Sequence, residues 1–579
     1  MVGINSGGRR QRRLLTRAIP LGALAAGAFL VGALLGGGPS GLAGGQRFAD
    51  SLERGDFAGM YAELTADSKQ RYAPEAFANA YRRADDVATV SSIDAGEADA
   101  GDRDHGEEAV APLTLRTRAF GTITRDLRLP LDEEQVAWSP NLVFPGLRAG
   151  EHLERSTRMP RRAAILARDG MPLAEGPAGA RTSPLGVAAQ SVVGATAAPK
   201  GEAEQRLFAR GVPPHTPVGT TGLELAFDGR LAGRPGGRLL AAGGGSGTHV
   251  LASSDPVPGK PVHTTIDPLL QRTAVASLGA QYGGVAVLDP KDGSVRALAG
   301  IAFSGPQPPG STFKIITTTA ALEAGAVKLT DQFPIQTSST VGGREIANAS
   351  GEACGGTFVE AFAESCNSVF VPLGPKLGSD RLVGTAERFG FNSTPTLYDD
   401  RATSLTRPKR STLPESIPSD VDLGVTAIGQ GQVLATPLEM ASVAQTIANG
   451  GVRAPTPIVT DPSLKADAKP VKVTSPDIAH TLRDLMIGVV TNGTGTAAAI
   501  PGVQVAGKTG TAELGPVDVS PGQKVTETAQ RVDAWFTSFA PAGDPKIVVA
   551  VMIVNASGAG GDVAAPIARD VLAAGLGSG

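Results

Sequence analysis

A chain of 579 residues has room for several domains, because a single domain commonly takes about 100–200 residues. Its 53 Lys and Arg and 56 Asp and Glu give a formal net charge of −3, which excludes the strongly basic character typical of nucleic-acid-binding proteins. Aromatic residues are only 4% of the chain, so packed cores must depend on Val, Leu, Ile and Ala.

The N-terminus combines a basic tail with an apolar run. Residues 1–17 contain five arginines: Arg9, Arg10, Arg12, Arg13 and Arg17. Residues 18–38 are uncharged, and a run of about 20 apolar residues can span a bilayer with its flanking Arg side chains on the cytoplasmic side. The alternative is a cleavable signal peptide, but the run is longer than usual and lacks a clean Ala-x-Ala site. We therefore expect a transmembrane signal-anchor with the rest of the chain outside the cytoplasm.

Residues 39–155 are predicted to be the first folded domain, which follows a flexible Gly-rich spacer at residues 36–45. Apolar residues recur there at helical spacing: Phe48, Leu52, Phe57 and Tyr61. The later segments 113–120 and 122–131 alternate apolar and polar residues, as half-buried strands do. Helices followed by strands predict a small α+β domain.

Between residues 156 and 257, the segments 161–176 and 221–237 carry Gly, Arg and Asp side chains that we expect in turns and salt links. Residues 239–260 are rich in Gly, Ser and Pro and are predicted to be a loop or linker.

Residues 258–579 are predicted to be the third domain. Asp267 and Pro268 are suited to the N-cap and first position of a helix, and residues 283–300 predict a hairpin around an Asp-Pro-Lys-Asp-Gly turn. A later Thr-Pro pair starts another helix, and the chain closes with two apolar strands and a C-terminal helix. These pieces predict helices packed on an antiparallel sheet.

A pattern of residues suited to catalysis begins after residue 310. Ser311 and Lys314 are three residues apart at the start of a predicted helix, so both lie on one helix face. A serine hydroxyl needs a base to become a nucleophile, and a lysine amine serves when burial or a nearby cation lowers its pKa. A helix N-terminus also directs backbone N–H groups at developing negative charge. On its own the pattern is weak, and an ordinary surface helix is the better interpretation.

Two further motifs change that interpretation. Ser-Cys-Asn at residues 365–367 lies 54 residues after Ser311, and Lys-Thr-Gly-Thr at residues 508–511 lies 143 residues further on. The order Ser-x-x-Lys, Ser-x-Asn, Lys-Thr-Gly is the three-motif set of penicillin-recognising serine acyltransferases. The chain resembles the class B penicillin-binding proteins, which are peptidoglycan D,D-transpeptidases.

This resemblance extends over most of the chain. Residues 46–155 resemble the NTF2-like N-terminal domain of the methicillin-resistance type, residues 156–257 the pedestal or dimerisation domain, and residues 258–579 the transpeptidase domain. The resemblance implies an α+β multidomain protein with a membrane anchor and a penicillin-binding domain in which helices flank an antiparallel sheet. It implies no cofactor and no metal, and the six His are scattered.

The motif residues have distinct expected roles in catalysis. Ser311 is the nucleophile and Lys314 its base. Ser365 is suited to relay a proton to the leaving nitrogen, and Asn367 to orient Lys314 and bind the substrate amide. Lys508 adds a second cation, which lowers the pKa of Lys314 by like-charge repulsion and helps to hold the substrate carboxylate.

The remaining motif residues are expected to bind substrate. The Thr509 and Thr511 hydroxyls are candidates for the carboxylate, and Gly510 lets substrate lie close to the strand. The family resemblance implies an oxyanion hole made of the backbone N–H groups of Ser311 and Thr511. One such donor contributes about 3 kcal/mol in other acyl enzymes.

Cys354 and Cys366 are the only cysteines, twelve residues apart and beside the Ser-x-Asn motif. In an exported protein they could form a disulfide across that loop, and two reduced, partly buried thiols are the equal alternative. A bridge would make one wall of the site rigid.

The resemblance implies a substrate and partners. Stem peptides ending in D-Ala-D-Ala would acylate Ser311, β-lactams would do the same, and the membrane and other wall-synthesis proteins would be partners, without nucleic acid. A β-lactamase needs a base for the deacylating water, and no segment matches the additional Glu loop of the class A enzymes. A D,D-carboxypeptidase, and a β-lactam- or muropeptide-binding scaffold or sensor, are further alternatives.

Overall fold

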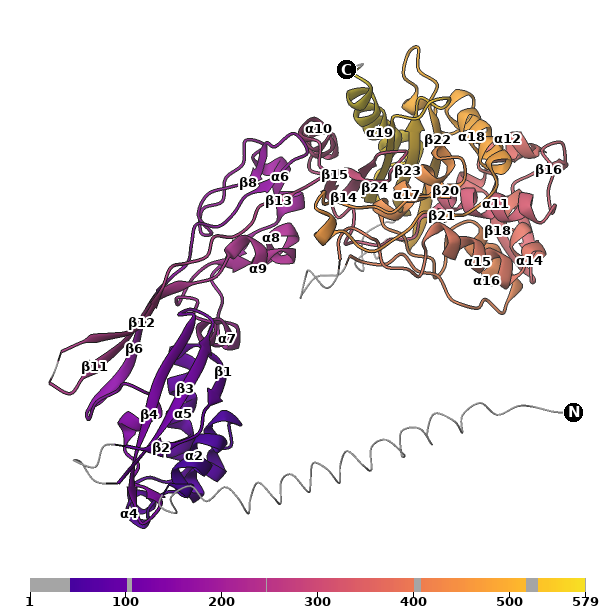
Figure 1. Ribbon diagram of the computed structural model, residues 1–579. Coiled ribbons are helices and arrows are strands. Elements are labelled where there is room, and N and C mark those ends of the chain that lie inside the picture. Colours follow the sequence, from indigo (N-terminus) through magenta and orange to yellow (C-terminus); the bar gives the residue numbers. More distant parts are fainter. Residues whose placement is uncertain (1–41, 102–106, 246, 400–407, 517–529, 578–579) are drawn as a thin grey trace, which may run out of the picture. The chain divides into compact units, whose positions relative to one another are not determined.

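The computed structural model describes residues 42–101, 107–245, 247–399, 408–516 and 530–577. The chain forms two compact units, each described by itself (Figure 1). The first contains the residues up to 160 together with 199–215 and 234–257, and the second contains 161–198, 216–233 and 258–579. The domain boundaries expected from the sequence stay a prediction.

The basic tail and the expected signal-anchor, residues 1–17 and 18–38, lie outside the described residues. In the part of the chain that the structure describes, no helix is both long and apolar enough to cross a membrane. The anchor therefore stays an expectation.

The first unit begins with helices and continues with strands, as its sequence predicts. Its helices are α2 (Ala43–Glu53), α3 (Phe57–Ala62), α4 (Ala66–Arg71) and α5 (Pro74–Ala88). An antiparallel sheet follows, made of β1 (Val90–Ala95), β2 (Asp99–Ala100), β3 (Glu108–Thr117), β4 (Thr122–Asp132) and β5 (Gln135–Val136). Helices and sheet share a buried core that includes the rings of Phe48, Phe77, Tyr81 and Trp138.

Helix α2 begins inside the segment that the sequence predicts as a spacer. Residues 43–45 are helical, and a Cβ atom on Gly44 would lie 1.8 Å from the carbonyl oxygen of Glu134. The absence of a side chain lets the helix backbone lie directly against the turn between β4 and β5. The spacer prediction is wrong for these three residues, because their composition reflects close packing instead of flexibility.

Residues 239–260 also differ from the sequence prediction. β11 (Gly236–Gly243) pairs in antiparallel fashion with β12 (His249–Ser254) and with β6 (Glu151–Arg158). Leu239 and Ala241 are fully buried in the core of the first unit. The linker prediction is wrong for residues 239–243 and 249–254, because a Gly-rich turn between two short strands hides their two-residue alternation.

The second unit is built on a five-stranded antiparallel sheet, which confirms the expected sheet type. Its strands, in spatial order, are β15 (Val295–Gly300), β14 (Gly283–Leu288), β24 (Ile547–Ala556), β23 (Gln530–Ala540) and β22 (Ala506–Pro516). Successive side chains of a strand point to opposite faces. In β14, Val285 and Val287 enter one core and Ala286 and Leu288 enter the other, so both faces of the sheet are covered.

Helices cover the two faces of this sheet (Figure 1). α10 (Pro268–Leu278) and α19 (Gly560–Leu576) pack on one face, and α17 (Pro437–Ala448) packs on the other. The predicted start of α10 is confirmed, because the Asp267 side chain accepts hydrogen bonds from the backbone N–H groups of Leu269 and Leu270. Further helices of this unit are α14 (Leu373–Leu377), α15 (Ser379–Phe389), α16 (Asp420–Ala427) and α18 (Pro476–Thr491).

The segments that the sequence assigns to turns and salt links contain a buried ion-pair network in the second unit. Arg162 donates to Glu224 at 2.7 Å and to Asp228 at 2.8 Å, and Arg181 donates to the other Glu224 oxygen at 2.7 Å. These residues hold α8 (Gly222–Ala226) and α9 (Asp228–Ala232) beside the extended segment that begins near residue 161. The expectation of salt links is confirmed.

Candidate active site

The predicted nucleophile lies in a 3₁₀ turn and not yet in an α-helix. Ser311 belongs to η3 (Gly310–Phe313), and α11 (Lys314–Glu323) continues directly from it. Side chains three residues apart are eclipsed in a 3₁₀ turn, so Ser311 and Lys314 still share one face. Ser311 is half-buried, whereas Lys314 is fully buried.

Two glycines hold this turn against β22. Gly310 has a φ of 52°, and a Cβ atom on it would lie 2.7 Å from the carbonyl oxygen of Thr511. A Cβ atom on Gly510 would lie 2.7 Å from the carbonyl oxygen of Pro309. The missing side chains therefore allow the backbone of the nucleophile turn to lie against the Lys-Thr-Gly strand. The space beside Gly510 is filled by the protein itself, and its expected role toward substrate stays a prediction.

Ser365, the first residue of the second motif, contacts both lysines of the site. It lies between α12 (Phe358–Ala363) and α13 (Asn367–Phe370), with a φ of 62° in the left-handed region. The Ser365 Oγ atom accepts from Lys508 Nζ at 2.8 Å and lies 3.3 Å from Lys314 Nζ. Lys314 Nζ also donates to the Ser365 carbonyl at 2.7 Å and to Asn367 Oδ1 at 2.8 Å. The fold thus brings both predicted lysines to the Ser365 hydroxyl, and Asn367 to Lys314.

Burial sets the protonation of the two lysines. Burial, and after it the charge of Lys508, holds the pKa of Lys314 well below its usual value. Burial lowers the pKa of Lys508 to about 7. At Lys314 the like charge of Lys508 adds to burial, and both favour the neutral amine that a general base needs.

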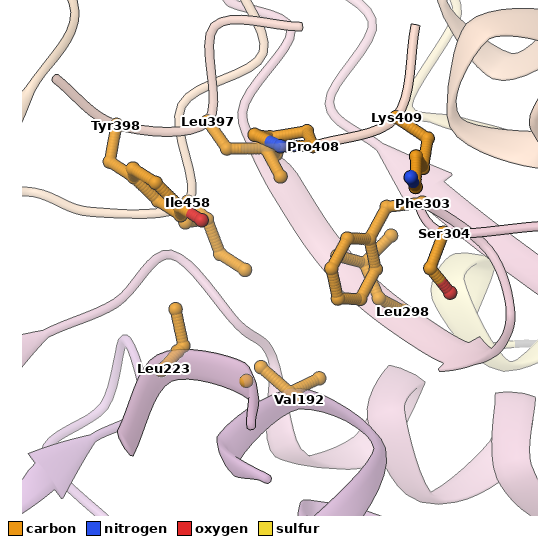
Figure 2. Close-up of a pocket in the computed structure, with 11 residues that line it drawn as sticks. Val192, Leu223, Leu298, Phe303, Ser304, Leu397, Tyr398, Pro408, Lys409 and Ile458 are labelled. Carbon is orange, nitrogen blue, oxygen red and sulfur yellow. The ribbon is translucent and has the colours of Figure 1, made fainter. Parts of the chain in front are cut away.

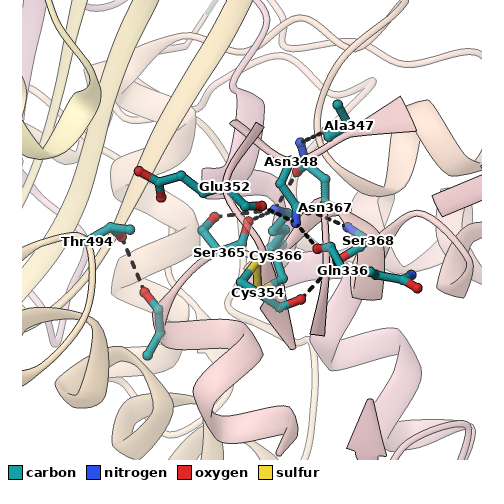
Figure 3. Close-up of a disulfide and its surroundings, with 12 residues drawn as sticks. Gln336, Ala347, Asn348, Glu352, Cys354, Ser365, Cys366, Asn367, Ser368 and Thr494 are labelled. Carbon is teal, nitrogen blue, oxygen red and sulfur yellow. Dashed lines mark hydrogen bonds between the residues drawn. A yellow bond between two sulfur atoms is a disulfide. The ribbon is translucent and has the colours of Figure 1, made fainter. Parts of the chain in front are cut away.

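The Asn367 side chain is hydrogen-bonded to a neighbouring β-hairpin (Figure 3). It consists of β17 (Ser338–Val341) and β18 (Arg344–Ala347), and Asn367 Nδ2 donates to the Ala347 carbonyl at 3.0 Å. Asn348, directly after β18, accepts from the Ser368 N–H at 2.8 Å and donates to the carbonyls of Gln336 and Glu352 at 2.8 and 2.9 Å. No local sequence pattern marks Asn348, whose side chain links its own turn to Gln336 and to Ser368, directly after the Ser-x-Asn motif.

The two cysteines form a disulfide (Figure 3). Cys366 lies between Ser365 and Asn367, and Cys354 begins β19 (Cys354–Thr357), which pairs with β16 (Gln332–Gln336). The bridge therefore attaches the middle residue of the second motif to a neighbouring strand.

The threonine hydroxyls of the third motif have partners within the protein. Thr509 Oγ1 lies 2.6 Å from Thr494 Oγ1, and Thr511 Oγ1 accepts from the backbone N–H of Gly560 at 3.4 Å. Thr494 lies in the Gly-rich segment before β22, and no local pattern marks it as a site residue. Either hydroxyl can be the donor of the bond between Thr494 and Thr509, and Thr494 Oγ1 also donates to the Ala363 carbonyl at 3.4 Å.

A mainly apolar cavity of about 150 Å³ lies elsewhere in the second unit (Figure 2). Val192 and Leu223 line it on one side, and Leu298, Phe303 and Ile458 line it on another. None of the predicted site residues lines this cavity, so it is separate from the candidate site. Among the described residues, no group of three or more His, Cys, Asp or Glu could hold a metal ion.

A serine on a turn that enters a helix, two buried lysines and a serine hydroxyl between them are the groups that a serine acyltransferase requires. Comparison with known proteins agrees. A family model described as the penicillin binding protein transpeptidase domain matches residues 283–573, and the chain belongs to this family. The NTF2-like N-terminal transpeptidase domain matches residues 43–151, and the penicillin-binding protein dimerisation domain matches residues 177–264.

Curated relatives carry the same family name. The peptidoglycan D,D-transpeptidase PbpA of Mycobacterium tuberculosis is 39% identical over 307 residues, which are 49% of this chain and 58% of that relative. PbpA of Mycolicibacterium smegmatis is 35% identical over 426 residues, which are 62% of this chain and 80% of that relative. The matched region thus spans little more than half the length of the M. tuberculosis protein.

Solved structures share the fold. The ceftriaxone acyl-enzyme complex of penicillin-binding protein A from M. tuberculosis has a TM-score of 0.56 and 29% identity, and covers 72% of this chain and 98% of its own. The penicillin G acyl-enzyme complex of the same protein has a TM-score of 0.55 and 30% identity, with coverages of 72% and 99%.

Proposed function

We propose that this protein is a peptidoglycan D,D-transpeptidase that cross-links stem peptides through an acyl-enzyme on Ser311. The observation that carries the proposal is the position of Ser365 Oγ, 2.8 Å from Lys508 Nζ and 3.3 Å from Lys314 Nζ. In this proposal Lys314 is the base for Ser311, and Ser365 Oγ is the proton path to the leaving group. The names of the PbpA relatives and the β-lactam acyl-enzymes of the M. tuberculosis neighbour support the same activity.

The acylation half of the reaction uses the neutral form of Lys314. Its amine takes the proton of Ser311 while Oγ attacks the carbonyl carbon of the penultimate D-Ala. The backbone N–H groups of Ser311 and Thr511 would stabilise the oxyanion. The C–N bond then breaks, the proton passes from Lys314 through Ser365 to the departing amine, and terminal D-Ala leaves.

The second half returns the enzyme to its starting state. The amine of a neighbouring stem peptide attacks the ester carbonyl, its proton moves to Lys314, and Ser311 leaves as the protonated alcohol. Lys508, with Thr509 and Thr511, would hold the terminal carboxylate of the donor before release. A β-lactam mimics that donor, and its ring-opened product stays attached to Ser311.

The location and the remaining domains belong to the same proposal. A signal-anchor at residues 18–38 would place the catalytic unit outside the cytoplasm, where cross-linking takes place. The NTF2-like and dimerisation domains would hold that unit away from the membrane and present surfaces to other wall-synthesis proteins. We propose the boundaries 39–155, 156–257 and 258–579 for the three extracytoplasmic domains.

Labelling of residues 40–579 with a fluorescent penicillin, followed over hours beside Ser311→Ala, tests the proposal. A Ser311-dependent label that persists is the expected result. Loss of label with turnover of the antibiotic would instead identify a β-lactamase, and no label on a folded protein would favour the scaffold or sensor function. Release of D-Ala from a stem pentapeptide, with and without an added amine acceptor, separates transpeptidase from D,D-carboxypeptidase.

A further inference from the structure

Two phenylalanine rings lie beneath the two lysines of the site. Lys314 Nζ is 5.1 Å from the ring centre of Phe370, and Lys508 Nζ is 5.6 Å from the ring centre of Phe362. Both rings are fully buried and lie 6.2 Å apart. A cation within about 6 Å of a ring face is attracted by the negative face of the ring, most strongly where water is excluded.

The positions of the rings follow from the second motif. Phe362 lies in α12, three residues before Ser365, and Phe370 ends α13, three residues after Asn367. The two short helices that flank the Ser-x-Asn turn therefore each carry one ring beneath one lysine. The same turn that supplies Ser365 and Asn367 to the lysines thus also fixes the rings.

We propose that Phe370 and Phe362 are positioning residues that stabilise the ammonium forms of Lys314 and Lys508, respectively, and so set the pH range of acylation. This inference rests on the proposed acyl-enzyme function and deepens it. A base must be neutral before the reaction and must hold a proton after it. Burial favours the neutral amine and lowers the pKa of Lys314. The ring of Phe370 favours the ammonium form and partly offsets this effect, so that Lys314 stays basic enough to accept the Ser311 proton.

The other groups around the lysines do not provide this stabilisation by charge. In the described part of the chain, no carboxylate is paired with either lysine. Lys314 Nζ faces the Ser365 and Asn367 oxygens and the like charge of Lys508, and Lys508 Nζ faces Ser365 Oγ and the Thr509 carbonyl. The carboxylates of α12, Glu360 and Glu364, are exposed, and Glu360 is bound to Thr357.

The test is the pH dependence of Ser311 acylation by penicillin in the full-length chain. Phe370→Leu keeps an apolar side chain but removes the ring face. We expect the acid limb, where Lys314 must lose its proton, to move down by about one pH unit and the plateau rate to fall. Phe362→Leu should instead move the alkaline limb, where Lys508 loses its charge, to lower pH.

Fluorinated phenylalanines test the same idea without changing the packing. A trifluorophenylalanine at residue 370 retains size and burial but weakens the negative ring face, so the acid limb should shift in the direction of Phe370→Leu. Phe358 is the matched control, because its ring packs 5.5 Å from that of Phe370 and is buried like it. Of the described residues, no Lys or Arg lies over the Phe358 ring.

The outcomes separate this inference from the proposed function. If the wild-type chain is not acylated at all, the function fails. If the wild-type chain is acylated but neither the fluorinated residue 370 nor the two leucine variants shift a limb of the pH profile, the rings only fill space and the inference is overturned. The inference is also overturned if Phe358→Leu shifts both limbs as far as Phe370→Leu and Phe362→Leu do.

Discussion

Lys508 Nζ donates to Ser365 Oγ at 2.8 Å, although 143 residues separate the two in the chain. The contact joins β22 to the turn between α12 and α13. Because Ser365 Oγ also lies 3.3 Å from Lys314 Nζ, a proton can move between the nucleophile side and the strand side of the site through one hydroxyl.

Ser365→Ala is expected to slow acylation by penicillin by about 10²–10⁴-fold, the range that general acid–base groups contribute. The substitution removes the shared hydroxyl but leaves Asn367 Oδ1 and the residue 365 carbonyl to hold Lys314. Stopped-flow acylation at pH 7 measures the effect. Ser368→Ala is the control, since among the described residues the Ser368 hydroxyl makes only a long contact of 3.5 Å, with the Cys354 carbonyl. Equal rates in the two variants would contradict the relay.

Asn348→Ala is expected to weaken the support of Asn367. The side chain makes three hydrogen bonds and is 5% exposed, so its loss should destabilise the protein by about 1–3 kcal/mol and slow acylation by about tenfold. Thermal unfolding and acylation rates at a temperature well below the transition measure the two effects separately. A fully active but less stable variant would show that Asn348 does not position the motif.

Thr494→Val is expected to raise the penicillin concentration needed for half-maximal acylation by about fivefold, and Thr494→Ser to restore it. Valine keeps the shape but removes the hydroxyl 2.6 Å from Thr509 Oγ1, and one hydrogen bond contributes about 1 kcal/mol. The concentration dependence of the acylation rate provides the measurement. An unchanged half-saturating concentration in the valine variant would rule out a role in orienting Thr509.

Loss of the Cys354–Cys366 bridge is expected to lower the free energy of unfolding by roughly 3 kcal/mol, because the bond closes a short loop and limits the unfolded chain. The paired substitution of both cysteines by serine, compared by denaturant unfolding with the wild-type protein in oxidising and reducing buffer, measures the change. The variant should not respond to the reductant. A wild-type protein whose stability is the same in both buffers would contradict the prediction.

Glu439 should make stability fall as pH rises. Burial raises its pKa to about 7 from a usual 4.5, in spite of the opposing charge of Arg453. Below pH 4.5 both folded and unfolded states are protonated. Between 4.5 and 7 only the folded state keeps the proton, so the free energy of unfolding decreases by roughly 3 kcal/mol across this range. Within the described residues, Glu439 Oε1 has no hydrogen-bond partner.

Glu439→Gln should flatten this dependence, since an amide does not titrate. Urea unfolding of both proteins between pH 4.5 and 8 gives the slope. A wild-type protein that gains stability over this range relative to the variant would have the opposite sign and would refute the assignment.

The sequence by itself determined the features that depend on neighbours in the chain. Asp267 caps α10, residues 283–300 form a hairpin, and the three motifs occur in their expected order, because each depends on a local pattern of a few residues. The composition of a segment was less reliable. Composition predicts flexible chain at residues 36–45 and 239–260, but the glycines at residues 44 and 45 allow close packing, and residues 239–243 and 249–254 lie in strands.

Only the tertiary structure decided which distant groups meet. Asn348, Thr494, Phe362 and Phe370 carry no local signal, since an Asn after a strand or a Phe in a helix is ordinary. Their partners lie in other segments, and packing of the helices against the sheet brings them together. The low pKa of Lys314 has the same origin: a lysine in a sequence has its usual pKa, and only burial beside Lys508 lowers it.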